Sequence, residues 1–195
     1  AIRYSEGDTV SITGTAEPNE NTTMWIKDGD GKIIHYDVFT SQANGNLNYG
    51  FPTNDIPTGT YTVIIKQKNG SDATIFGIGK YPTPRVVTMM AETNFMLNSQ
   101  AMLSIVGPPS SNLSIKILDS NDNIVINDSI ITSAAGKSRY AIDLVDLSSG
   151  IYRAVVSSIN IQDSIKFSVG LEAGSGQISL LTIQEKYSPG DSILV

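Results

Sequence analysis

The chain has 195 residues, a formal net charge of −6 and no cysteine. The acidic balance argues against nucleic acid as a partner, because phosphate binding needs clustered Lys and Arg, and it favours small cations or basic partners. Without cysteine there is neither a disulfide framework nor a thiolate metal site. No apolar run approaches the roughly 18 residues that span a bilayer, and the abundant Asn, Ser, Thr and Gly are typical of extracellular β modules.

The sequence repeats. The stretch Tyr4-Ser5-Glu6-Gly7-Asp8 returns 183 residues later as Tyr187-Ser188-Pro189-Gly190-Asp191, which leaves room for two units of about 91 residues. Five landmarks recur at the spacing of 91: Asp28 and Asp119, Tyr49 and Tyr140, Gly59 and Gly150, Phe76 and Phe167, and Gly79 and Gly170. This spacing predicts two tandem domains, residues 1–80 and 81–171, followed by residues 172–195 as a linker and the start of a third repeat.

Domain 1 reads as a series of short strands. Residues 8–16 alternate, with Val10 and Ile12 on one face, and the pattern predicts a half-buried strand. Residues 22–27 and 33–39 flank the turn sequence Asp28-Gly29-Asp30-Gly31 and predict a hairpin. No window sustains helical spacing, so the sequence predicts an all-β, immunoglobulin-like β-sandwich. Further strands are expected at residues 47–51, 61–65 and 73–78.

Domain 2 follows a linker at residues 80–85 that Pro82 and Pro84 stiffen. Its strand at residues 102–106 is expected to match the first strand of domain 1 with a two-residue shift. Domain 2 has Ser99-Gln100 where the Gly-Asp of the opening motif is expected. The remaining strands should keep the order of domain 1. They are expected at residues 86–90, 113–118, 124–130, 138–144, 152–157 and 165–169.

The strand at residues 86–90 has no counterpart in domain 1, because the chain begins three residues before Tyr4. We therefore expect domain 1 to lack its first strand. Two explanations remain open. The sequence is a segment of a longer protein with that strand upstream, or residues 178–183 of a neighbouring molecule complete domain 1 by strand addition.

No catalytic set is evident, and the sequence predicts a protein that is not an enzyme. His35 is the single histidine, and it falls on a predicted strand as a surface or edge residue. The run Gly136-Lys137-Ser138 resembles the end of a phosphate-binding loop, but Ile131 occupies the position of the required first glycine.

Oxygen ligands are concentrated in two equivalent turns, at Asp28 and Asp30 in domain 1 and at Asp119 and Asn121 in domain 2. Calcium binds such oxygens. Tight hairpin turns prefer the same residues, however. Calcium binding and ordinary turn formation therefore both remain open for these positions.

Four Asn-x-Ser/Thr sequences are candidate glycosylation sites, at Asn21, Asn69, Asn112 and Asn127. The first three are predicted to lie in segments between strands, where a glycan is easily carried. Trp25 alternates away from Met24 and Ile26 and is a candidate exposed aromatic. Its predicted role is either a platform for a ligand or a contact with a neighbouring domain.

Three sequence motifs resemble those of a known family: the Tyr-Ser-x-Gly-Asp opening, the hairpin from Ile26 to Gly31 and the corner from Pro57 to Val63. They are similar to the tandem immunoglobulin-like domains of archaeal cell-surface proteins, most like the S-layer proteins of ammonia-oxidising archaea. The resemblance implies a secreted, glycosylated structural subunit that self-associates into a lattice or filament and often binds calcium. The alternatives are an adhesin or binding stalk and an accessory region of an extracellular enzyme.

Overall fold

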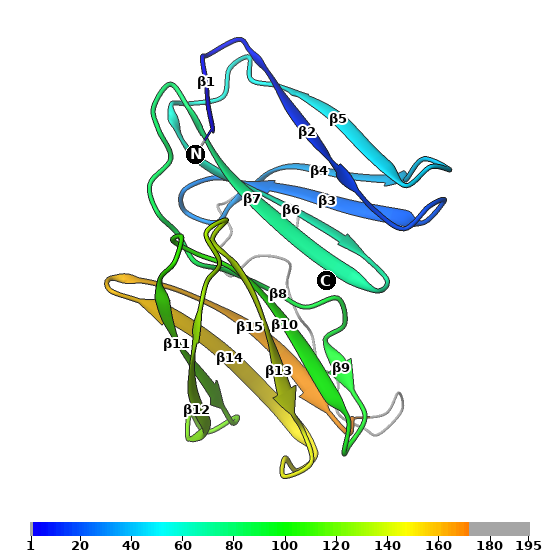
Figure 1. The fold of residues 1–195 in the computed structure, drawn as a ribbon, viewed down its shortest axis with the longest axis vertical. Helices are drawn as coiled ribbons and strands as arrows, with labels where there is room; N and C mark the ends of the chain where they lie inside the picture. Colours follow the sequence, from blue (N-terminus) through cyan, green and yellow to red (C-terminus); the bar gives the residue numbers. More distant parts are fainter. Residues whose placement is uncertain (1, 172–195) are drawn as a thin grey trace, which may run out of the picture. The chain divides into compact units, whose positions relative to one another are not determined.

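The computed structural model describes residues 2–171, and β-strands are the regular structure throughout them (Figure 1). The chain divides between Thr83 and Pro84 into two compact units, here domain 1 and domain 2. The predicted all-β fold with tandem immunoglobulin-like sandwiches is confirmed. The predicted start of a third repeat lies outside the described residues.

Domain 1 contains two sheets that face one another across its core. Their orders are β1-β7-β6-β3-β4 and β2-β5. The bounds of the strands are β1 Ile2–Tyr4, β2 Thr9–Thr15, β3 Asn21–Lys27, β4 Ile33–Thr40, β5 Asn46–Pro52, β6 Gly59–Gln67 and β7 Gly70–Ile78.

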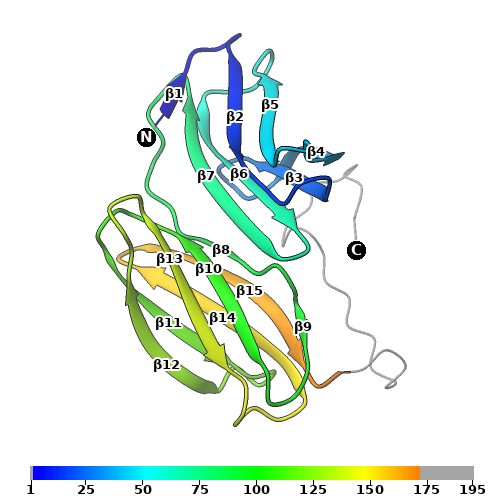
Figure 2. The ribbon, with the colours of Figure 1, turned by 45° about the vertical axis from the view of Figure 1, so that its right-hand side comes forward.

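Domain 2 also contains two sheets, ordered β12-β11-β14-β15-β9 and β13-β10-β8 (Figure 2). Its strands are β8 Val87–Met89, β9 Asn94–Phe95, β10 Gln100–Val106, β11 Asn112–Leu118, β12 Ile124–Ile131, β13 Lys137–Asp143, β14 Gly150–Ser158 and β15 Ile161–Val169.

The two domains share one strand order. The larger sheet of domain 2 repeats the larger sheet of domain 1, with β9, β15, β14, β11 and β12 in the places of β1, β7, β6, β3 and β4. The smaller sheets also agree in register, because Thr9 lies opposite Pro52 in domain 1 and Gln100 lies opposite Asp143 in domain 2, 91 residues on. The predicted correspondence of the two sandwiches is therefore confirmed. The difference is β8, for which domain 1 has no counterpart within the described residues.

Alternating apolar residues of both sheets meet in each core. Ile26 and Val63 in domain 1, and Ile117 and Ala154 at the equivalent positions of domain 2, are at most 1% exposed. The core of domain 2 also includes Val86 and Met90, which flank β8. Strands with one buried face repeat with a period of two residues, and this period is what the sequence pattern detected.

A tyrosine hydrogen bond fixes the start of β6 in domain 1 and of β14 in domain 2. The Tyr61 hydroxyl donates to the carbonyl of Pro57, and the Tyr152 hydroxyl donates to the carbonyl of Ser148 at 2.8 Å. Such tyrosine corners are common in immunoglobulin-like sandwiches. Since the acceptor is a backbone carbonyl, domain 2 keeps the bond although serine stands at the position of Pro57.

Two predictions made from the sequence were wrong. The expected two-residue shift does not occur, and Asn98, rather than Ser99, takes the place of Gly7. Both residues adopt a left-handed conformation, with φ of 86° at Gly7 and 58° at Asn98, which asparagine tolerates better than most residues. The short strands β1 and β9 were also missed, because two or three residues are too few to show alternation.

Candidate functional site

The acidic turn of domain 1 is organised by Asp28. Its Oδ1 accepts the backbone N–H groups of Asp30 and Lys32, each at 2.9 Å. The backbone N–H of Asp28 donates to the carbonyl of Lys32 at 2.9 Å and closes the hairpin. The carboxylate therefore stabilises the turn, which is the ordinary use of aspartate at such a position.

The equivalent turn of domain 2 uses Asp119 in the same way. Its Oδ1 accepts the N–H groups of Asn121 and Asn123 at 2.8 and 2.9 Å. Hydrogen bonds from the side chain and the backbone of Asn123 lower the pKa of Asp119 below its ordinary value. A second acid of this turn, Asp122, forms an ion pair with Arg153. A guanidinium beside the turn is unfavourable for a cation site there.

The predicted calcium ligands are thus brought together in pairs, Asp28 with Asp30 and Asp119 with Asn121. Within residues 2–171, no group of three or more His, Cys, Asp or Glu side chains is arranged to hold a metal ion. Calcium usually takes six to eight oxygen ligands, so backbone carbonyls or water would have to supply most of them here. Calcium binding remains a prediction.

All four candidate glycosylation asparagines are exposed. Asn69 lies in the turn between β6 and β7, as predicted. Asn21 and Asn112, however, are the first residues of β3 and β11, and the expectation that they lie between strands was wrong. They occupy equivalent positions of the repeat. Asn127 lies within β12, an edge strand.

A tyrosine and an aspartate meet at the same place in both domains. In domain 2 the Tyr140 hydroxyl donates to Asp128 at 2.9 Å. In domain 1, burial of Tyr49 and its hydrogen bond to Asp37 raise the pKa of the tyrosine to about 12. Each pair joins the edge strand of the larger sheet, β4 or β12, to a strand of the smaller sheet, β5 or β13. The pair therefore holds the two sheets together at this edge.

His35 belongs to this region of domain 1 and lies on the edge strand β4. Its Nε2 is 2.7 Å from the Tyr49 hydroxyl, and its ring lies 5.1 Å from that of Phe51. Ile126 occupies the equivalent position of domain 2. The histidine thus contributes to packing between the two sheets, in agreement with its predicted place at an edge.

Trp25 is partly buried, so the expectation of an exposed aromatic was wrong. Its ring centroid lies 6.1 Å from that of Tyr36, which is 44% exposed. The run Gly136-Lys137-Ser138 ends a tight turn that connects β12 to β13 in the other sheet, where the Gly136 N–H donates to the carbonyl of Ser133. These residues form no phosphate-binding loop.

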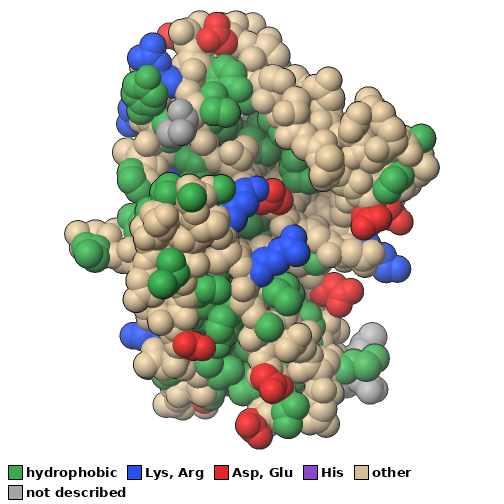
Figure 3. All heavy atoms as spheres, viewed as in Figure 1, with side chains coloured by type: hydrophobic (Ala, Val, Ile, Leu, Met, Phe, Trp, Pro, Cys, Tyr) green, Lys and Arg blue, Asp and Glu red, His purple; other side chains and the backbone are tan. Residues whose placement is uncertain are grey.

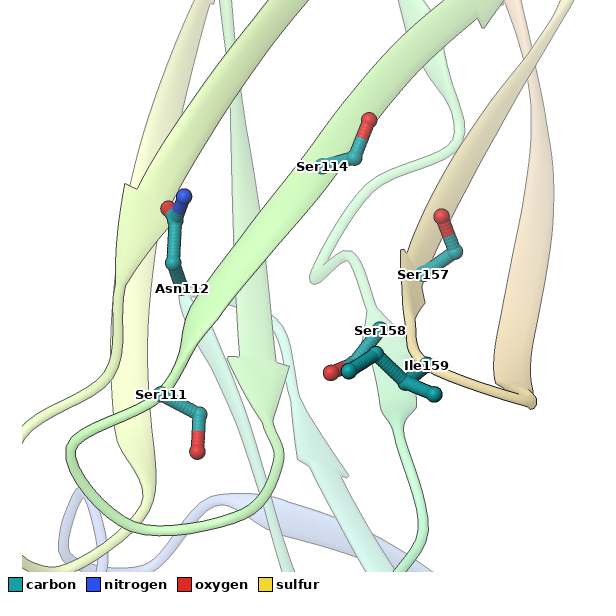
Figure 4. A pocket seen from close by; sticks show the side chains of 6 residues that line it. All are labelled: Ser111, Asn112, Ser114, Ser157, Ser158 and Ile159. Atoms are coloured by element: carbon teal, nitrogen blue, oxygen red, sulfur yellow. The ribbon is translucent and has the colours of Figure 1, made fainter.

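A shallow hollow of about 520 Å³ lies on domain 2 (Figure 4). Ser114 and Ser157 are direct cross-strand partners on β11 and β14. The lining supplies hydroxyl groups and the amide of a candidate glycosylation site, and it contains no acid, base or cation. The lining residues are Ser111, Asn112, Ser114, Ser157, Ser158 and Ile159.

One contact was not predicted from the sequence, and this contact holds β8 in domain 2. The Asp163 carboxylate on β15 accepts the backbone N–H of Thr88 at 2.7 Å and its hydroxyl at 2.8 Å. Strand β8 is thereby bound to one sheet by the ladder with β10 and to the other sheet by this carboxylate. A signal was present in the sequence, because Asp72 stands 91 residues before Asp163.

Charged side chains are sparse and mixed. On the face shown in Figure 3, acidic and basic side chains are interspersed among uncharged polar ones. Among residues 2–171, no helix has the length and apolar character that crossing a membrane requires.

Residues 81–169, which comprise most of domain 2, match the protein family described as "Secretion system C-terminal sorting domain". No curated protein sequence matches the chain significantly.

Similar solved structures include a tetra-tandem repeat from the extending region of a large adhesion protein, with 18% identity and a TM-score of 0.37 over 83% of this chain and 45% of that chain. The Yersinia pseudotuberculosis adhesin InvE has 11% identity and a TM-score of 0.37 over 86% and 56%. Trypsin-activated alpha-2-macroglobulin from Escherichia coli has 12% identity and a TM-score of 0.36 over 87% and 15%. The chain thus spans about half of each adhesin structure and a small part of the macroglobulin.

Proposed function

We propose that the chain is a non-catalytic, structural segment of a secreted cell-surface protein, and specifically of a surface-layer subunit. The observation that carries the proposal is the repetition. Both domains keep the same strand order, the tyrosine corner and the inter-sheet Tyr–Asp pair at a spacing of 91 residues. The residues that repeat are the ones that build the sandwich, as expected of a structural array of similar units.

The match of residues 81–169 to a secretion sorting family supports export. The polar, weakly charged surface and the four exposed candidate glycosylation sites agree with an extracellular location. The resemblance to the S-layer proteins of ammonia-oxidising archaea is carried by the three sequence motifs described above.

An adhesin or binding stalk is the second candidate. The sorting-family match also agrees with this candidate, because the match supports secretion without requiring a lattice. A stalk would carry its ligand site on another domain, and the two domains described here would serve as spacers.

Calcium and small cations belong to the proposal as partners. The turns at Asp28 and Asp119 would take up calcium only with help from backbone carbonyls and water, so we expect weak binding. The net charge of −6 favours a diffuse, salt-sensitive attraction for small cations, including ammonium.

Assembly on a surface separates the two candidates. The purified chain would be incubated with and without calcium on a lipid monolayer and imaged by electron microscopy. A layer subunit gives an ordered two-dimensional array, and an Asp28→Ala, Asp119→Ala variant tests the calcium dependence. Particles that stay single under all conditions would favour a stalk, and hydrolytic activity of the purified chain would contradict both candidates.

A further inference from the structure

The outer face of the larger sheet of domain 2 carries three cations and no acid on its strands β11, β14 and β15. Side chains of a strand alternate between the two faces of its sheet. Since Ile117, Ala154 and Phe167 are buried in the core, their neighbours Lys116, Arg153 and Lys166 lie on the outer face. The other outer residues of these strands are uncharged: Asn112, Ser114, Leu118, Ile151, Val155, Ser157, Gln162, Ser164 and Ser168.

The three cations are neighbours across the sheet. Arg153 lies directly opposite Lys166 on β15, and it lies opposite Leu118 on β11, which places Lys116 diagonally beside it. Cβ atoms of direct partners are about 5 Å apart, and those of diagonal neighbours are about 7 Å apart. Arg153 forms an ion pair with Asp122. Lys116 and Lys166 are exposed and have no acidic partner within residues 2–171.

The sandwich itself does not require these cations. Like charges directly opposite one another on a sheet are destabilising, so the Arg153–Lys166 pair is unfavourable for folding. The equivalent positions of domain 1, 91 residues earlier, are Trp25, Thr62 and Ile75. Both domains nevertheless have the same strand order. A cluster that opposes folding and differs between the repeats is best explained by a role in binding.

Hydrogen-bonding groups border the cations on the same face. The hollow of about 520 Å³ includes Ser114 and Ser157, which are cross-strand partners (Figure 4). Lys116 follows Ser114 by two residues on β11, so it lies about 7 Å further along the strand. Gln162 lies opposite Ser157 on β15 and extends the polar row. The face therefore offers cations and hydroxyl or amide groups side by side.

This combination indicates the chemistry of a ligand. Clustered cations without a neighbouring acid on the sheet favour a polyanion, and hydroxyl and amide groups match the hydroxyls of sugars. The outer residues of β11, β14 and β15 include no aromatic ring on which the bases of a nucleic acid could stack. We propose that this outer face binds an acidic polysaccharide. Lys116, Arg153 and Lys166 contact its carboxylate or sulfate groups, and the hollow contacts its hydroxyls.

The net charge of −6 does not exclude such a ligand. Charges more than about 8 Å apart are largely screened at physiological ionic strength, so nearby cations govern an anion on this face more than distant acids do. Asp122 competes for Arg153 and limits the affinity. The inference adds an attachment role to a layer subunit and to a stalk alike, and it does not rest on either candidate function.

Binding of the purified chain to alginate, dextran sulfate and neutral dextran tests the proposal, with biolayer interferometry as the measurement. At least one anionic polymer should bind about tenfold more tightly than dextran at low salt, and added salt should weaken its binding. Comparing the two polymers distinguishes carboxylate from sulfate as the preferred group. No preference over dextran would overturn the proposal. So would equally tight binding of polyglutamate or single-stranded DNA, which have the charge but lack the sugar hydroxyls.

Removal of single cations tests the residues. Lys116→Ala and Lys166→Ala should each weaken polysaccharide binding about fivefold, as expected for one partly screened charge contact. Arg139→Ala is the matched control, because Arg139 is exposed on β13 of the other sheet and its loss changes the net charge equally. This control should bind like the native chain. Equal losses in Lys116→Ala and Arg139→Ala would assign the attraction to overall charge and refute the site.

Two further variants separate binding from folding. Lys166→Ala removes the like charge opposite Arg153, so thermal melting of domain 2 should stay the same or rise while binding falls. Asp122→Asn releases Arg153 from its ion pair and should strengthen binding about twofold. Weaker binding of Asp122→Asn, or a lower melting temperature of Lys166→Ala, would contradict the proposal.

Discussion

Domain 1 and domain 2 are the same sandwich with different edges. Both have a tyrosine corner, stacked on Phe76 in one domain and on Phe167 in the other. They differ where β8 lies: domain 2 holds this strand on β10 and Asp163, whereas β2 of domain 1 presents Gly14 and exposed threonines. Within residues 2–171 the two domains therefore share the core and the corner and differ in the first edge strand.

The largest effect should come from the corners that the domains share. Tyr61→Ala and Tyr152→Ala should each lower the free energy of unfolding of their own domain by about 3 kcal/mol, because a buried ring and its hydrogen bond are both lost. Calorimetry would resolve the two transitions. Tyr61→Phe and Tyr152→Phe lose only the bond and should cost about 1 kcal/mol. Unchanged melting of the alanine variants would show that the corner is peripheral.

The contact unique to domain 2 should come next. Thr88→Val keeps the shape of the side chain but removes the hydroxyl that donates to Asp163, and should destabilise domain 2 by about 1.5 kcal/mol in chemical denaturation. Thr88→Ser retains the donor and should cost much less. If both variants unfolded at the same denaturant concentration, the hydroxyl would not be what holds β8.

Alkaline pH should weaken the Tyr–Asp pairs of both domains, because burial and the neighbouring aspartate raise the pKa of Tyr49 and the pKa of Tyr140. The folded pKa of Tyr49 is raised to about 12 from an ordinary value of 10. Since the folded state then holds its proton more tightly than the unfolded state, stability is complete below pH 10 and falls as the pH rises from 10 to 12.

Tyr49→Phe should remove this loss from domain 1. Thermal melting of the native chain and the variant, compared at pH 9 and pH 11.5, would measure it. An identical decline in both would assign the alkaline instability to other groups.

The smallest effect should be found at Gly14 on β2. Gly14→Ala should stabilise domain 1 by about 0.5 kcal/mol, because glycine inside a strand costs conformational entropy and nothing obstructs the added methyl group. Gly45→Ala is the contrasting variant, since its Cβ would lie 2.8 Å from the carbonyl oxygen of Ala16 and its φ is 74°. A destabilising Gly14→Ala would contradict the absence of any obstruction around this glycine.

Much of the candidate site was also accessible from the sequence. The turns at Asp28 and Asp119 were found because turn chemistry is local, and the sequence letters alone locate the glycosylation asparagines. The partial burial of Trp25 was not predictable, because alternation reports which face a residue occupies and not what covers that face. The Thr88–Asp163 contact joins residues 75 positions apart. The recurrence of aspartate at positions 72 and 163 marks Asp163 as part of the repeat, but no local pattern indicates its partner.

The sequence by itself determined the repeat, the β class and most strands, because the spacing of 91 and the two-residue alternation are properties of residues near one another in the chain. It also determined which face of each strand is buried, since the apolar side chains of a strand alternate with polar ones and pack into the core. The tertiary structure alone decided the exact register, in which Asn98 replaces Gly7, and the parallel strands β1 and β9. It also decided that β8 is attached through Asp163. These features depend on hydrogen bonds between distant segments, whose partners are selected only when the whole sheet is assembled.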